Sequence, residues 1–161
     1  TGMSPLYPSL PEVSEELFDK VVGVNFKGPF RLASLIGTRM AEGDGGSIIN
    51  VSSIAAVAPT PHELVYAGAK AALDAMTSGM ARAFGPQVRC NVIMPGPFLT
   101  DISKAWDLEA FNARAKTEIP LQRGGEAHEI VGAALYLASD ASSYTSGATI
   151  RIDGAMAYTA G

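Results

Sequence analysis

Three short runs of β-branched and apolar residues alternate with long helical patterns, and this alternation limits the possible folds more than any other feature. The runs occupy residues 47–52, 89–94 and 148–152. The first shows little polar alternation, as in strands covered on both faces of a parallel sheet. Because helical patterns separate the runs, the order predicts right-handed βαβ units. We expect helices over residues 14–40, interrupted at Gly28-Pro29, over 62–84 and over 126–138.

A parallel sheet of three strands is thin, and its first strand is expected to be a bare edge. Natural folds normally pair or cover such an edge. The 161 residues, 47% of them hydrophobic, suffice for the core of one domain. We therefore expect residues 1–161 to form an α/β domain that is part of a larger fold.

Composition narrows the possible partners and the setting. The net charge of −4 comes from scattered acids and bases, with no basic stripe for phosphates, so we expect no nucleic-acid partner. No run approaches the length of a membrane span, and Cys90 stands alone, so neither membrane insertion nor an internal disulfide is expected. His62 and His128 lack partners at metal-ligand spacing, and no metal site is expected. A soluble, cytoplasmic protein fits these features.

Tyr66 and Lys70 are the first candidates for chemistry. They lie four residues apart in a predicted helix, so both side chains leave the same face. A lysine ammonium there can stabilise a tyrosinate and lower the tyrosine pKa from its usual value of about 10. The alternative is a solvated surface pair, which many helices contain by chance.

Ser53 and Asn25 extend this pattern. Ser53 lies just past the carboxyl end of a predicted strand, where open α/β sheets place their sites, and its hydroxyl could bind a substrate oxygen. The alternative for Ser53 is ordinary turn chemistry. Asn25 is polar within an apolar helical stretch. For Asn25 the alternative is a helix kink or an internal hydrogen bond.

Taken in order, these residues resemble the motifs of the short-chain dehydrogenase/reductase family. The resemblance covers nearly the whole chain and includes the interval between Ser53 and Tyr66. It implies a Rossmann-like, doubly wound parallel sheet, of which this chain would be the C-terminal, catalytic part. The matching segments are Asn25, Ile49-Asn50-Val51-Ser52-Ser53, Tyr66-Ala67-Gly68-Ala69-Lys70, Pro95-Gly96-Pro97-Phe98-Leu99-Thr100, Ile119-Pro120-Leu121-Gln122-Arg123-Gly124, residues 137–144 and Ile152-Asp153-Gly154.

The resemblance implies a role for each of the four polar residues in a hydride transfer between NAD or NADP and an alcohol or carbonyl substrate. Tyr66 would be the general acid/base, and Lys70 would lower its pKa and bind the nicotinamide ribose. Ser53 would orient the substrate oxygen, while Asn25 would hold a water that links Lys70 to solvent.

The resemblance also implies two loops around the reaction. Backbone at Pro95, Gly96 and Phe98, with the Thr100 hydroxyl, would cradle the nicotinamide amide and a neighbouring phosphate. Residues 98–123 resemble the family's substrate loop. Within that loop, substrate contact and lid packing remain equally open for Trp106, Leu108 and Phe111.

One family motif has no counterpart here. The glycine-rich turn that receives the pyrophosphate is absent from the sequence, and residues 43–46 stop a helix before a strand, the reverse of that turn. Thr1-Gly2 could be the remnant of an Asn-Asn-Ala-Gly motif. We therefore expect the chain by itself to be an inactive fragment, and the resemblance further implies a homodimer or homotetramer. The alternatives are a non-catalytic oligomerisation module with relic site residues and, more remotely, a hydrolase using Ser53 and Lys70.

Overall fold

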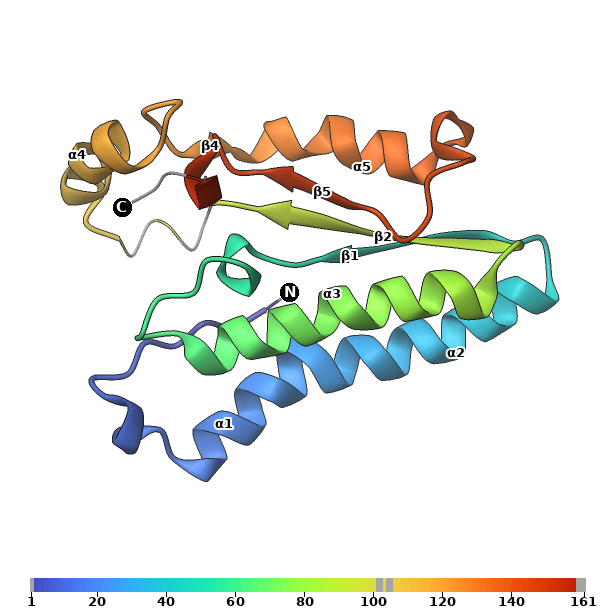
Figure 1. Cartoon of the computed structure of the whole chain (residues 1–161), viewed down its shortest axis with the longest axis horizontal. Coiled ribbons are helices and arrows are strands. Elements are labelled where there is room, and N and C mark those ends of the chain that lie inside the picture. Colours follow the sequence, from blue (N-terminus) through green and yellow to red (C-terminus); the bar gives the residue numbers. More distant parts are fainter. Residues whose placement is uncertain (1, 101–102, 104–105, 159–161) are drawn as a thin grey trace.

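A three-stranded parallel sheet forms the centre of the computed structural model, which describes residues 2–100, 103 and 106–158 (Figure 1). Its strands are β1 (Gly46–Val51), β2 (Val88–Pro95) and β5 (Thr149–Ile152), in the order β1-β2-β5. Both pairs are parallel, with Ile48 opposite Cys90 in the first. The predicted fold class and all three strands are confirmed, and β1 is an edge strand within the described residues.

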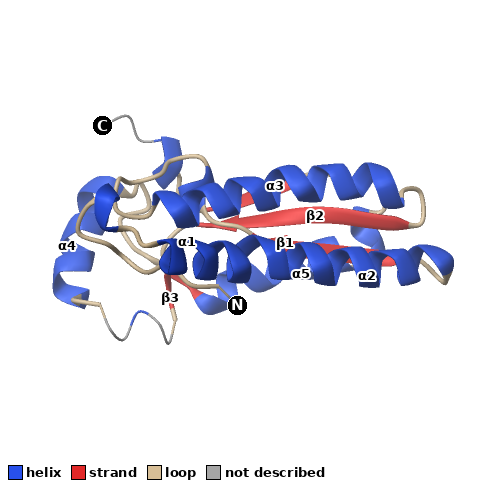
Figure 2. Cartoon of the chain, turned by 90° about the horizontal axis from the view of Figure 1, so that it is seen from below, coloured by secondary structure: helices blue, strands red, loops and turns tan. Residues whose placement is uncertain are grey.

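Helices cover both faces of this sheet. Helices α2 (Gly28–Glu42) and α3 (Leu64–Phe84) pack on one face, and α5 (Val131–Ala138) packs on the other (Figures 1 and 2). The arrangement is doubly wound, as expected when right-handed crossovers connect parallel strands. No helix within the described part of the chain combines the length and the apolarity of a membrane span.

An irregular helical segment precedes the first strand of the sheet in the sequence. Helix α1 (Glu15–Val22) begins at Ser14, whose Oγ accepts the Leu17 N–H at 3.1 Å. A π-helical turn, η2 (Gly23–Lys27), joins it directly to α2, and the Gly28 N–H donates to the Gly23 carbonyl. The predicted interruption at Gly28-Pro29 is therefore wrong. Pro29 stands in the first turn of α2, directly after the π-helical turn.

The segment after β2 contains pairing that the sequence did not predict. Strand β3 (Phe98–Leu99) pairs in parallel with β4 (Gly125–Glu126), and α4 (Leu108–Glu118) lies between the two strands in the sequence. Two-residue strands are too short to show a periodicity. The predicted helix over 126–138 begins as a 3₁₀ turn, η5, before α5. The 3₁₀ turns are η1 (Leu10–Glu12), η3 (Ile54–Ala56), η5 (Ala127–Ile130), η6 (Asp140–Ser142) and η7 (Met156–Tyr158).

The core lies between the sheet and its helices. Cys90 and Leu137 are fully buried, and Leu73 on α3 is 2% exposed. The Cys90 thiol belongs to a cluster that also contains Met80 and Val88. Burial raises the pKa of this thiol to about 11, so Cys90 is an inert core residue.

Candidate active site

The site forms where the carboxyl ends of β1 and β2 face the first turns of α3. Ser53 follows β1 and caps η3, its Oγ accepting the Ala55 N–H at 3.2 Å. Hydrogen bonding with the same side chain lowers the pKa of Tyr66, on the facing helix α3. The structure thus shows Ser53 as a turn residue, and its role toward a substrate remains a prediction.

Tyr66 lies half-buried in the first turn of α3. Burial raises its pKa, the hydrogen bond from Ser53 lowers it, and the carboxylate of Glu63 raises it further. The lowering expected from Lys70 is not found. Desolvation of the phenolate outweighs the hydrogen bond, so the protonated phenol is favoured.

Lys70 is buried one turn after Tyr66, with 5% of its surface exposed. Its Nζ donates to the Val51 carbonyl at 2.8 Å and lies 5.7 Å from the centre of the Tyr66 ring. At that distance the ammonium lies over the ring face of Tyr66. Burial lowers the pKa of Lys70, and the carboxylate of Asp74 opposes this.

Asn25 lies in the π-helical turn and is 1% exposed. Its Nδ2 donates to the Val21 carbonyl at 2.9 Å and to the Met3 carbonyl at 2.8 Å, while Oδ1 accepts the Met3 N–H at 3.3 Å. A Cβ at Gly2 would stand 2.9 Å from Asn25 Oδ1 and 3.7 Å from Lys70 Nζ. The N-terminal segment thus brings Asn25 and Lys70 to one place. The water relay remains a prediction, and Thr1 lies outside the described residues.

A tyrosine outside the motifs anchors this N-terminal segment. Tyr7 is 6% exposed, and its Oη accepts the Leu64 N–H at 2.6 Å. Its carbonyl lies 3.4 Å from His62 Nδ1. Tyr7 therefore occupies a backbone N–H at the start of the helix that carries Tyr66 and Lys70.

The residues expected to cradle the cofactor lie at the end of β2, on the same edge of the sheet as Ser53. The Gly96 N–H donates to the Ile152 carbonyl at 2.9 Å, and a Cβ at Gly96 would stand 2.8 Å from Asp153 Cα. Only glycine lets the chain pass here. Thr100 is held by Ser103, whose Oγ accepts the Thr100 N–H at 3.0 Å and donates to its carbonyl at 2.7 Å.

The substrate loop packs partly on itself. Phe111 is 8% exposed and clusters with Ala115 and Ile119. The Trp106 and Phe111 ring centroids lie 5.3 Å apart, and Trp106 and Leu108 are 39% and 45% exposed. For Phe111 this favours lid packing. Residues 101–102 and 104–105 of the loop lie outside the described residues.

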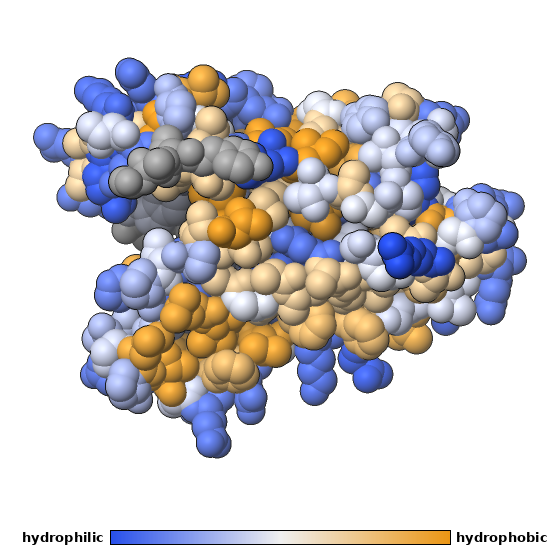
Figure 3. Space-filling model, in the orientation of Figure 1, coloured by the Kyte–Doolittle hydropathy of each residue, from blue (hydrophilic) through white to orange (hydrophobic). Residues whose placement is uncertain are grey.

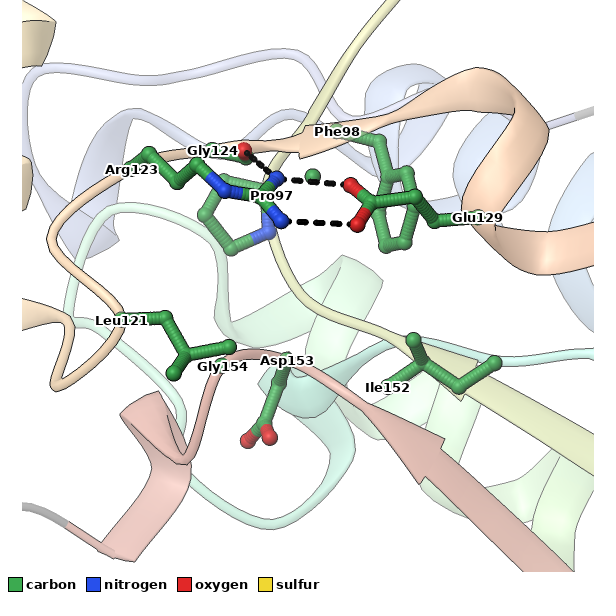
Figure 4. Close-up of a pocket in the computed structure, with 10 residues that line it drawn as sticks. Pro97, Phe98, Leu121, Arg123, Gly124, Glu129, Ile152, Asp153 and Gly154 are labelled. Carbon is green, nitrogen blue, oxygen red and sulfur yellow. Dashed lines mark hydrogen bonds and ion pairs between the residues drawn. The ribbon is translucent and has the colours of Figure 1, made fainter.

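An ion pair closes a small pocket beside β3 and β4. Figure 4 shows the Arg123 guanidinium facing the Glu129 carboxylate, with both N···O distances 2.7 Å. The hydrogen bond from Arg123 lowers the pKa of Glu129 to about 2. Asp153 points elsewhere and accepts the N–H groups of Ala155 and Ala157 at 3.0 Å. These charges are used within the protein, which makes this pocket structural.

A larger, mostly apolar groove runs between α2 and the edge of β1. Its walls include Leu32 and Ile36 from α2 and Ile48 from β1, and Lys70 lines it as well. Within the described residues, no group of three or more His, Cys, Asp or Glu side chains could hold a metal ion.

The sequence interpretation missed three polar residues around Lys70 and Tyr66. Glu63 acts on Tyr66, and both Ser52 and Asp74 lie beside Lys70. Asp74 could have been noticed, because it is an acid one helical turn after Lys70 in an alanine-rich helix. Nothing in the sequence indicated that Glu63 faces the tyrosine.

The chain is similar to many oxidoreductases. A family model described as enoyl-(acyl carrier protein) reductase matches residues 1–157. The L-rhamnose 1-dehydrogenase (NAD(P)(+)) of Azotobacter vinelandii is 36% identical over 159 residues, covering 96% of this chain and 61% of that protein. A short-chain type dehydrogenase/reductase of Picea abies is 33% identical over 149 residues, covering 92% of this chain and 55% of the relative.

Solved structures of dehydrogenases are similar to this chain as well. A gluconate 5-dehydrogenase from Burkholderia cenocepacia, in complex with NADP and tartrate, superposes with a TM-score of 0.93 at 28% identity. It covers 99% of this chain and 63% of the other. A 4-hydroxyisoleucine dehydrogenase mutant complexed with NADH and succinate gives 0.92 at 30% identity, covering 100% and 66%. The chain spans about three fifths of the length of the curated relatives it matches.

Proposed function

The chain belongs to the short-chain dehydrogenase/reductase family, and on that premise we propose that it supplies the proton-transferring side chains for hydride transfer between NAD(P) and a small alcohol or ketone. One observation carries the proposal: the half-buried Tyr66 has the Lys70 Nζ 5.7 Å from the centre of its ring, and it lies close enough to Ser53 for hydrogen bonding with Ser53 to lower its pKa. A solvated surface pair would show neither the burial nor the serine partner.

Each polar side chain has a task in this proposal. The Tyr66 hydroxyl exchanges a proton with the substrate oxygen, and its raised pKa keeps that proton available for a carbonyl. The Ser53 hydroxyl binds the same substrate oxygen and holds it near the phenol. Lys70 provides positive charge close to the developing anion.

The residues present fit a nicotinamide cofactor. An ammonium has three N–H bonds, and Lys70 gives one to Val51, which leaves capacity for ribose hydroxyls. At Gly96 the backbone packs so tightly on Asp153 that the turn is fixed, with the Thr100 hydroxyl nearby in the chain. When bound, the nicotinamide would supply or accept the hydride. NAD or NADP is therefore the proposed cofactor.

A chimera tests this proposal. The matched segment of the Azotobacter vinelandii L-rhamnose 1-dehydrogenase is replaced by this chain, and formation of reduced cofactor is followed with L-rhamnose and small polyols. We expect turnover to fall about 10²–10⁴-fold in Tyr66→Phe. The matched control is Tyr144→Phe, a fully exposed tyrosine, which should leave turnover unchanged. Equal turnover in the two variants would refute the role of Tyr66.

We also propose that the 161-residue chain alone has little dehydrogenase activity, since it contains no glycine-rich turn for the pyrophosphate. Calorimetry of the mass-verified chain with NAD(P), together with a turnover assay, tests this. Clear binding with turnover would contradict it.

A homodimer or homotetramer, in the cytoplasm, completes the proposal. Apart from Leu64 and Arg82, the exposed positions of α3 carry small residues, which would let another helix approach closely. Figure 3 shows this face, with apolar side chains gathered near the first turns of α3. The neighbouring α2 exposes Leu32 and Leu35, at 62% and 64%. Light scattering tests the assembly, and a monomeric mass would contradict it. The exposed small residues are Gly68, Ala71, Ala75, Ser78, Gly79 and Ala83.

A further inference from the structure

Asp74 is a partly buried carboxylate on α3, one helical turn after Lys70. Its Oδ1 is buried and has no hydrogen-bond partner among the described residues. A buried carboxylate oxygen without a partner is costly unless a nearby charge compensates it. The Lys70 ammonium is that charge, since each of the two groups favours the charged form of the other.

Asp74 is also connected to the end of β1. Ser52 is 3% exposed, and its hydroxyl donates to the Lys70 carbonyl at 3.4 Å. Hydrogen bonding with Ser52 also lowers the pKa of the Asp74 carboxyl, after burial has raised it. Lys70 in turn donates to Val51 at 2.8 Å. Two polar links therefore join α3 to the strand end that carries Ser53.

We propose that Asp74 is a positioning residue for the reaction proposed above: its buried carboxylate, one helical turn after Lys70, is the counter-charge of the buried Lys70 ammonium. The proposal rests on the proposed function. Asp74 acts through Lys70 and has no contact with substrate or cofactor in this scheme.

At this site, Asp74 and Lys70 are the charged groups that shift the pKa of one another. The other titratable side chains at the site are Tyr66 on α3 and Glu63, the N-cap residue of α3, whose carboxylate acts on Tyr66. Charged groups of the elements packed against α3 are not causes of either pKa shift. These groups are Glu15, Glu16, Asp19 and Lys20 on α1, Lys27 in η2, Arg31, Arg39 and Glu42 on α2, and Arg89 on β2.

The direct test is the titration of Lys70 in the 161-residue chain, labelled with ¹³C at lysine Cε and followed by NMR. In Asp74→Asn the midpoint of the Lys70 titration should move to lower pH, because the buried ammonium loses its counter-charge. Asp44→Asn makes the same charge change at an exposed residue and should leave the midpoint unchanged. The same midpoint in both variants would overturn the proposal.

A reciprocal measurement covers the case in which Asp74→Asn does not fold. The Asp74 carboxyl is titrated in the wild-type chain and in Lys70→Met, where its midpoint should move to higher pH. Linkage requires the two couplings to be equal. An Asp74 titration midpoint that is the same in the wild-type chain and in Lys70→Met would also overturn the proposal.

The chimera adds a catalytic readout that separates this proposal from the proposed function. In Asp74→Asn the alkaline limit of turnover should move to lower pH, and Asp74→Glu should restore it. A wild-type chimera without turnover would end the proposed function, while the NMR titrations would still decide whether Asp74 holds Lys70. Lost turnover in Asp74→Asn with an unchanged Lys70 midpoint would count against the positioning role.

Discussion

Replacing Leu137 with alanine is expected to destabilise the fold by about 3–4 kcal/mol. Among the described residues of α5, Leu137 is the one that is fully buried, so it anchors the helix to its face of the sheet. Buried leucine-to-alanine changes cost about 2–5 kcal/mol, depending on how far the site can collapse. We expect a loss near the middle of that range, and not at its lower end, because of how the backbone at Leu137 is held.

The carbonyl of Leu137 ties the end of α5 in place. It accepts hydrogen bonds from Ser47 Oγ at 2.7 Å, from Arg89 Nη2 at 3.0 Å and from Ser142 Oγ at 3.1 Å. The substitution leaves these bonds intact, so α5 cannot slide to fill the space that the side chain leaves. A cavity then persists, and its cost adds to the lost transfer free energy.

Urea unfolding followed by circular dichroism measures the loss, with the slope expected to stay the same. Leu135→Ala is the matched control: it makes the same change on the same helix at a side chain that is 64% exposed, and should cost less than about 0.5 kcal/mol. A loss below about 1 kcal/mol for Leu137→Ala, or equal losses in the two variants, would show that α5 is not held in this way.

Two further predictions concern an ion pair and two glycines. Glu129→Gln should lower the melting temperature at neutral pH, because Arg123 depresses the pKa of Glu129 to about 2. The stability that this ion pair contributes is present above about pH 4.3 and is lost as the pH falls through 2. Added salt should make the difference in melting temperature smaller. Gly37→Ala should lower the melting temperature, because the new Cβ would collide with the Phe84 ring. Gly68→Ala places its Cβ where nothing lies within 4 Å, so it should raise stability by about 0.5–1 kcal/mol. The reverse order of the two variants would refute this packing of α2 on α3.

The strands could be predicted because a buried parallel strand leaves a clear pattern. Residues 47–52 and 89–94 were bounded by glycine and proline turns, and the structure moves their ends by only one residue. The pairing of β3 with β4 left no such trace. A Cβ at Gly125 would stand 2.7 Å from the Phe98 ring, so tertiary packing determines that pair.

The spacing of residues in the sequence predicted which side chains share a helical face, but it did not predict the pKa shifts of those side chains. Tyr66 and Lys70 share a face of α3, as four-residue spacing requires. The direction of the pKa shift of Tyr66 was wrong, because it depends on burial and on Glu63, and the ammonium of Lys70 turns toward Val51. A sequence places side chains on a helical face, but it does not show which carbonyl a lysine will reach.

Gly2 gives a physical reason for a motif that was first recognised only by resemblance. An added Cβ would stand 2.9 Å from Asn25 Oδ1, closer than real Cβ atoms come. Asn25 cannot easily yield, because its amide is held by Val21 and by both backbone groups of Met3. Glycine at this position is thus what lets the N-terminal segment lie against Asn25 and Lys70 together. The π-helical turn positions Asn25, and Gly2 allows the N-terminal segment to reach it. Neither residue predicts this contact from the sequence alone.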